Sequence, residues 1–227
     1  MSADGVWRAA ALVAGKDLRI ELRSRVTTQQ VAPFAVLVLI LFAFALDPAA
    51  GVLERASSGL FWVAVLLCSL LAVQRAFSLE AADGGRDGLR LSGLDPMGVF
   101  LGKVGAVGAQ LLVLEAVLAV GVVVLYGRQV TGVPLLVATC LTATAGLAAA
   151  GSLYGVLAAG LRVRETLLPI MLLPALSPVL IGATESFDAA LGGVAAEGWP
   201  WCGALAFFAA LYLAVGAVAF GPLLEEQ

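Results

Sequence analysis

The chain has 227 residues, of which 61% are hydrophobic and only 13% are charged, and its net charge is −3. A soluble domain carries about a quarter charged residues, so this composition excludes an ordinary soluble fold. The acidic balance leaves no large basic patch and argues against nucleic acid as a partner. The apolar content excludes a disordered chain, and three cysteines are too few for a disulfide scaffold of this length. The sequence therefore indicates a polytopic membrane protein.

Long windows without charged residues divide the chain into six candidate membrane spans. Each window reaches or approaches the length of about 20 apolar residues that a helix needs to cross the hydrocarbon layer. The windows are apolar on all faces, which predicts helices rather than the alternating strands of a barrel. We predict an all-α polytopic membrane protein with one membrane domain over residues 1–227. The predicted spans cover residues 27–46, 57–75, 99–126, 134–160, 166–184 and 199–222.

A charged segment precedes the first span, and we predict that residues 6–25 form an amphipathic helix in the membrane interface. The alternative is a solvated helix that only satisfies the positive-inside rule. The interfacial interpretation depends on apolar residues that recur at spacings of three or four and so share a helix face, namely Trp7, Ala11, Leu12, Leu18 and Leu22.

The basic residues lie unevenly about the predicted spans. All but Arg55 and Arg128 of the 13 lysines and arginines fall before the first span, between spans two and three, or between spans four and five. The positive-inside rule then predicts that both termini are cytoplasmic. On the opposite side, the sequence predicts an acidic loop at residues 185–197.

No constellation of catalytic residues occurs in the sequence. Histidine is absent, which removes the commonest metal and haem ligand and the base of hydrolytic triads. The three cysteines, Cys68, Cys140 and Cys202, lie in different spans and are interpreted as packing residues. We predict no catalytic, metal-binding or cofactor-binding residue, and a chain that is not an enzyme on its own.

Small residues inside the spans predict close helix packing. Gly98 with Gly102, and Gly151 with Gly155, are four residues apart and so share one face of a helix. The fifth span contains three prolines that favour bends, either in a structural helix or in one that lines a path: Pro169, Pro174 and Pro178.

A carboxylate, Glu115, interrupts the third span. Because an isolated carboxylate in hydrocarbon costs several kcal/mol, we expect Glu115 to face the bundle interior or a subunit interface. A structural hydrogen bond and a role in transport are both open for this residue.

The longest cytoplasmic connection, residues 76–98, contains charges of both signs, several glycines and an apolar side formed by Leu89, Leu91 and Leu94. A loop that only joined two spans could be far shorter, so we interpret it as a docking element for a soluble partner, with a solvated loop as the alternative. The candidate docking residues are Glu80, Asp83, Gly84, Arg86, Asp87, Leu89, Arg90, Leu91 and Leu94.

With six spans, an amphipathic start and this docking segment, the chain resembles the ABC-2 type exporter permeases. It resembles more narrowly the CcmB family, the permease component of the haem exporter in cytochrome c maturation. The resemblance covers essentially the whole chain and is most specific before residue 105. The matching residues are 16–23 (KDLRIELR), 62–64, 70–72, Arg75, Phe77, 83–84, Leu89, Leu94, Pro96 and 103–104.

This resemblance implies a permease in the bacterial cytoplasmic (inner) membrane that couples ATP hydrolysis by another subunit to haem export or to release of a haem-loaded periplasmic chaperone. The implied partners are a cytoplasmic ATPase (CcmA-like), a haem-handling membrane subunit (CcmC-like), a small accessory membrane protein (CcmD-like) and a second copy of the chain. Haem and ATP would be handled by those partners, and residues 76–98 would dock on the ATPase. The alternatives are an ABC-2 permease for a drug, lipid or polysaccharide, and a membrane scaffold that needs no ATPase.

Overall fold

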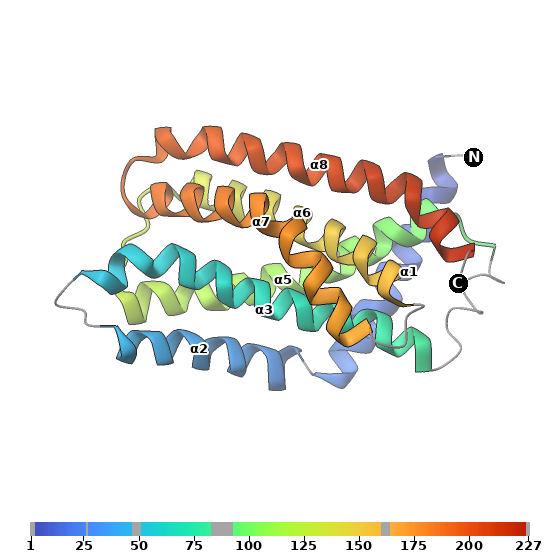
Figure 1. The fold of residues 1–227 in the computed structure, drawn as a ribbon, viewed down its shortest axis with the longest axis horizontal. Helices are drawn as coiled ribbons and strands as arrows, with labels where there is room; N and C mark the ends of the chain where they lie inside the picture. Colours follow the sequence, from blue (N-terminus) through green and yellow to red (C-terminus); the bar gives the residue numbers. More distant parts are fainter. Residues whose placement is uncertain (1–2, 26, 47–50, 83–92, 160–163, 226–227) are drawn as a thin grey trace.

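The structure, a computed structural model, describes residues 3–25, 27–46, 51–82, 93–159 and 164–225, and the elements in these ranges are all helical (Figure 1). Most helices are long and lie side by side in one bundle. In chain order they are α1 (Ala3–Ser24), the π-helix η1 (Thr27–Val31), α2 (Ala32–Ala45), α3 (Val52–Ala82), α5 (Pro96–Tyr126), α6 (Val133–Ala159), α7 (Arg164–Leu191) and α8 (Ala195–Glu225).

Five helices, α3 and α5 to α8, are long and apolar enough to cross a membrane, and the number becomes six if the bent pair of α1 and α2 is counted as one span. The two helices of this pair meet at an angle of 53°. The predicted all-α polytopic fold is confirmed. Helices η1 and α2 lie over residues 27–45, within the predicted first span, and α1 lies over most of the predicted interfacial helix. The interfacial position of α1 and the bounds of the spans in the membrane stay predictions.

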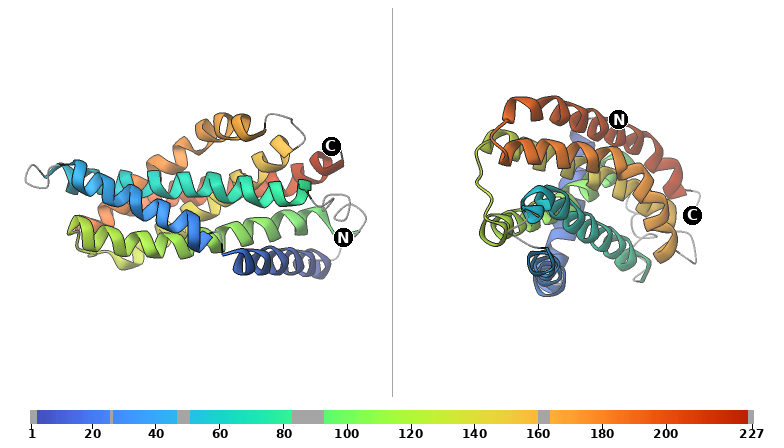
Figure 2. Two further views of the ribbon diagram at one scale, coloured as in Figure 1. Left: turned by 90° about the horizontal axis from the view of Figure 1, so that it is seen from below. Right: turned by 60° about the vertical axis from the view of Figure 1, so that its left-hand side comes forward.

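The bent pair follows α5 from its first turns to its last. A Cβ atom added to Gly98, near the start of α5, would lie 2.6 Å from the Cβ of Ala9 in α1. At the other end of α5, the hydroxyl of Tyr126 donates a hydrogen bond of 3.0 Å to the carbonyl of Leu39 in α2. Figure 2 shows α1 against the flank of α5, outside the rest of the bundle. The pair therefore runs from one end of the bundle to the other.

Glycine pairs bring the other helices together, as the sequence predicts. Gly151 of α6 faces Val73 of α3, whose Cγ2 would lie 2.5 Å from an added Cβ, and Gly155 faces the ring of Phe77. Because a side chain at either glycine would meet α3, both glycines permit the close approach of α6.

The apolar core involves residues of all the α-helices, and an aromatic cluster of it lies between α3 and α7. The ring of Phe61 stacks on that of Phe187 with 4.4 Å between centroids, and Trp62 packs edge-on against both. Each of these three side chains is at most 1% exposed. Buried aromatic groups of this size contribute strongly to packing.

Helix α7 is bent (Figure 1), and Pro169, Pro174 and Pro178 lie inside it. Each proline removes a backbone donor from the helix and crowds the preceding turn. The hydroxyl of Tyr212 in α8 donates to the carbonyl of Ala175, between Pro174 and Pro178. A donor from the neighbouring helix therefore supports this region of α7.

The end of α7 differs from the prediction. Residues 185–197, expected to be an acidic loop, are helical apart from residues 192–194, and Gly193 makes the turn with φ +80°. Glu185 and Asp188 lie in the last turns of α7, and Glu197 lies in the first turn of α8. The acidic residues therefore lie within the two helices and do not form a loop between them.

Candidate functional site

The first contact of interest joins α1 to the start of α5 through small residues. A Cβ at Gly98 would lie 2.6 Å from the backbone oxygen of Val6, and one at Gly102 would lie 2.7 Å from the oxygen of Ala10 and from the Cβ of Val13. Only glycine allows the two helices to approach so closely. The predicted packing role of this glycine pair is confirmed.

Two ion pairs then fasten α1 to α5 and α3. Asp17 and Glu21 are four residues apart on α1 and so lie on one face. The Oδ2 of Asp17 is 3.6 Å from the Nζ of Lys103 on α5, and the Nε of Arg75 on α3 donates to the Oε2 of Glu21 at 3.2 Å. We call these four residues the α1 clamp. Arg75 and Lys103 flank the predicted docking segment, so α1 holds both helices that carry it.

Lys103 is the most deeply placed charge of the α1 clamp. Its side chain is 1% exposed, and its Nζ lies 4.7 Å from the centroid of the Phe77 ring. A cation over an aromatic face is stabilised by the ring quadrupole, and a buried cation also needs a nearby carboxylate. Asp17 supplies that carboxylate from α1, while the more exposed Lys16 contacts the same carboxylate at 3.0 Å.

The described parts of the docking segment extend the two flanking helices. Helix α3 continues through residues 76–82, which include Glu80, and α5 begins at Pro96 with Asp95 as its cap. The side chain of Asp95 accepts a hydrogen bond of 2.9 Å from the backbone of Met97, and Pro96 suits the first helical position. Leu94 is half-buried and packs against the core of the bundle. The other predicted docking residues, Asp83, Gly84, Arg86, Asp87, Leu89, Arg90 and Leu91, lie outside the described residues.

Glu115 lies inside the bundle, where α5 meets α6. Its side chain is 2% exposed, and the hydroxyl of Thr144 donates to its Oε1 at 2.5 Å. The Oε2 of Glu115 has no hydrogen-bond partner among the described residues. Cys140 lies one turn earlier than Thr144 on α6. Cys140 is half-buried and packs against the core, so its predicted packing role is confirmed, whereas the sequence did not reveal the contact of Glu115 with Thr144 because these two residues lie on different helices.

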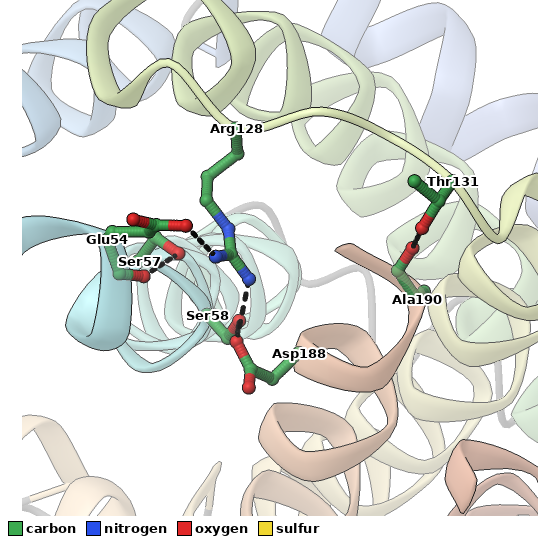
Figure 3. A network of polar contacts seen from close by, with 7 residues as sticks. All are labelled: Glu54, Ser57, Ser58, Arg128, Thr131, Asp188 and Ala190. Carbon is green, nitrogen blue, oxygen red and sulfur yellow. Dashed lines mark hydrogen bonds and ion pairs between the residues drawn. The ribbon is translucent and has the colours of Figure 1, made fainter. Parts of the chain in front are cut away.

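A further cluster, missed by sequence reasoning, joins the start of α3 to the end of α7 (Figure 3). Arg128, which follows α5, donates to Glu54 at 2.9 Å and to Asp188 at 3.0 Å, while Ser58 donates to the same oxygen of Asp188. The Arg128 side chain is 10% exposed, whereas the two carboxylates are at least half exposed. One feature of the sequence could have indicated this cluster. Arg128 is one of only two basic residues on the side opposite the predicted cytoplasmic segments, so it was a candidate for an ion pair there.

Beside Arg128, the connection between α5 and α6 is fastened to α7. Thr131 donates through its hydroxyl to the carbonyl of Ala190 at 2.9 Å, and the backbone N–H of Gly132 donates to the same carbonyl at 2.8 Å (Figure 3). This end of the bundle is therefore held by polar contacts across three elements. Over the ranges that the structure describes, no group of three or more acidic or cysteine side chains is placed to hold a metal ion.

Comparison with known proteins identifies the family of this chain. The CcmB protein family matches residues 8–225, which include most of α1, the α1 clamp and all later helices. The chain belongs to the CcmB protein family. Among curated relatives, heme exporter protein B of Haemophilus influenzae is 32% identical over 211 residues, covering 91% of this chain and 90% of the relative.

Two further relatives carry the same name. Heme exporter protein B of Paracoccus denitrificans is 32% identical over 207 residues, covering 90% of this chain and 91% of its own length. Heme exporter protein B of Escherichia coli strain K12 is 34% identical over 215 residues, covering 85% and 86% of the two chains. This CcmB family chain is a multi-pass protein of the bacterial inner membrane.

Proposed function

We propose that this chain is the permease subunit of an ABC-type haem exporter in cytochrome c maturation. The observation that carries the proposal is the CcmB match over residues 8–225, together with relatives named heme exporter protein B that align over most of their length. The chain works with a separate ATPase subunit, a haem-handling membrane subunit, a small accessory membrane protein and a second copy of itself. ATP and haem are handled by those partners, and this chain performs no catalysis.

The α1 clamp supports a route by which an ATPase acts on the membrane helices. The docking segment is continuous with α3 at one end and with α5 at the other. Because Glu21 holds Arg75 and Asp17 holds Lys103, α1 restrains the same two helices from the side. A push on the segment therefore moves α3, α5 and α1 together as one body, in the manner of hinge or shear transmission.

The arrangement of the helix ends supports a cytoplasmic location for both termini. A Cβ at Gly221, near the end of α8, would lie 3.5 Å from Pro96 at the start of α5, and α1 begins at the same end of the bundle. The docking segment and the α1 clamp are at this end, and Arg128 is at the other. This end faces the cytoplasm, because most basic residues of the sequence lie there.

The orientation is tested by cysteine labelling with a membrane-impermeant maleimide in a chain whose three cysteines are replaced by alanine. Gln129→Cys and Val194→Cys place a thiol at exposed positions of the Arg128 end, and Asp4→Cys places one at an exposed position at the start of α1, at the opposite end of the bundle. We expect the first two to react in intact cells and Asp4→Cys to react only after lysis. The reverse pattern contradicts the orientation.

The function is tested by complementation of a strain that lacks its own heme exporter protein B. We expect the chain, expressed with its partner subunits, to restore covalent haem in c-type cytochromes and to copurify the ATPase subunit. Failure to restore cytochromes while the ATPase still copurifies would indicate a different cargo. The absence of a copurifying ATPase would indicate a scaffold.

Docking is tested with Leu89→Asp and Leu91→Asp together. Leu94 is left intact because it packs against the core, and a change there would also affect folding. The matched control is Val194→Asp, which puts the same carboxylate on the exposed turn between α7 and α8. We expect the double variant to lose both ATPase copurification and cytochrome maturation and the control to keep both. Wild-type ATPase retention in the double variant would refute docking at this segment.

A further inference from the structure

A groove opens between the second half of α1 and the middle of α5. It has a volume of about 450 Å³, within the range of roughly 300–1,000 Å³ that small-ligand sites occupy. From α1, its lining residues follow one helix face at spacings of three and four, and from α5 they occupy neighbouring turns. The lining residues are Leu18, Glu21, Leu22, Arg25, Ala109, Gln110 and Val113.

The charges of the groove favour an anion. Glu21 is already engaged by Arg75 at 3.2 Å, so its negative charge is compensated from α3. Arg25 is exposed, and the described residues place no carboxylate within ion-pair distance of it. The lining itself carries one carboxylate and one guanidinium, and because Glu21 is paired with Arg75 from outside the groove, the guanidinium of Arg25 is the charge that a ligand can meet. The side-chain amide of Gln110 adds a hydrogen-bond donor.

The walls of the groove favour a hydrocarbon chain beside that anion. Leu22 is 76% exposed and Val113 is 67% exposed, and both face outward from the bundle. Gln110 lies seven residues beyond Lys103 on α5, a distance of about 10 Å along the helix. Arg25 lines the same groove as Gln110 and so lies at a similar distance along α5. A charged arginine side chain is costly in hydrocarbon unless it reaches a phosphate or water, and long basic side chains do so by extending toward the interface.

We propose that this groove binds an anionic phospholipid, with the headgroup phosphate on Arg25 and an acyl chain along Leu22 and Val113. Arginine forms two parallel hydrogen bonds to a phosphate, and in a zwitterionic lipid the charge of that phosphate is already compensated by the ammonium group of the same headgroup. Basic pockets between membrane helices on the cytoplasmic side bind anionic headgroups. The lipid joins α1 to α5 beyond the last contact of the α1 clamp and stabilises the bend between α1 and α2.

The test is native mass spectrometry of the purified full-length chain, in detergent, titrated with phosphatidylglycerol or phosphatidylcholine. We expect one tightly bound phosphatidylglycerol per chain, and a loss of about fivefold in affinity in Arg25→Gln, the effect of about 1 kcal/mol for one basic group. The matched control is Arg23→Gln, which removes the same charge from an exposed position of α1 outside the groove. It should bind as the unchanged chain does.

A second variant tests the apolar wall without changing any charge. Val113→Trp fills the groove and should lower phosphatidylglycerol binding, while excess inorganic phosphate should not compete, because it lacks the acyl chain. Equal losses in Arg25→Gln and Arg23→Gln, or equal binding of the two lipids, would overturn the proposal. So would a photo-crosslinker at Val113 that captures a second copy of the chain in place of lipid. None of these measurements requires haem or an ATPase, so they are independent of the proposed function.

Discussion

Replacing Asp17 with Asn tests how strongly the α1 clamp holds α1 to α5. The Nζ of Lys103 lies 3.6 Å from the Oδ2 of Asp17, with side chains 1% and 15% exposed. At an effective dielectric constant of about 20, two unit charges at this separation attract by about 4–5 kcal/mol. Loss of one partner from a buried pair costs about 3–5 kcal/mol, since the other charge stays in a poor solvent.

The partial exposure of Asp17 places the expected loss near the lower end of that range. We expect Asp17→Asn to lower the free energy of unfolding by about 3 kcal/mol, which is a fall in Tm of about 6–12 °C for a chain of this length. Thermal unfolding in detergent, followed with a thiol-reactive fluorogenic dye, measures this shift. Cys68 and Cys202 are buried and free, so they react with the dye when the bundle opens.

Two matched variants separate the buried pair from a general charge effect. Lys16 contacts the same Asp17 carboxylate but is 45% exposed, so Lys16→Gln should cost no more than about 1 kcal/mol. Asp17→Asn combined with Lys103→Met removes both charges and should recover most of the loss, because no buried charge is left alone. A fall in Tm for Asp17→Asn no larger than that for Lys16→Gln would refute the reasoning. So would a double variant whose fall in Tm equals the sum of the falls for Asp17→Asn and Lys103→Met alone.

Three further predictions concern packing and polar contacts elsewhere. Gly98→Ala should cost about 1–3 kcal/mol because its Cβ would lie 2.6 Å from α1, whereas Gly59→Ala, with open space around it, should be neutral or stabilising in the same thermal assay. Arg128→Gln should cost only about 1 kcal/mol, and salt should reduce the difference, because its carboxylate partners are well exposed. Thr144→Val should cost about 1–3 kcal/mol by removing the donor to a buried carboxylate, and Glu115→Gln should cost less because its amide oxygen still accepts that bond. Wild-type cytochrome maturation in Glu115→Gln would leave this residue a structural role only.

The long helices could be predicted because their apolar windows match the thickness of the hydrocarbon layer. The predicted span at residues 99–126 agrees with α5 to within three residues at its start. The predicted end of the fifth span, at residue 184, was too early because Glu185 and Asp188 indicated a loop. In the folded chain Asp188 pairs with Arg128 from a distant segment, so the helix continues to Leu191. Composition cannot reveal a partner that only folding brings near.

The place of α1 could be predicted only in part. The sequence showed an amphipathic helix, and its predicted apolar stripe does point away from the bundle, with Trp7 67% and Leu22 76% exposed. The face that packs on α5 consists instead of smaller residues, among them Ala9 and Val13, which are almost fully buried. Small side chains give a weak periodic signal, and the ion pairs of α1 join residues far apart in sequence. Neither contact follows from a local pattern.

The helices that flank the docking segment each make a rigid contact with the second half of the bundle. Phe77 of α3 packs on Gly155 of α6, and Phe100 of α5 packs on Gly216 of α8. A ring against a glycine leaves little room for side-chain adjustment, so a shift of one helix must move the other. Because the α1 clamp joins α3 and α5 at the same end, we expect a displacement of the proposed docking segment to reach α6 and α8 together. We expect α7, which contains three prolines and is bent, to absorb such a displacement most easily.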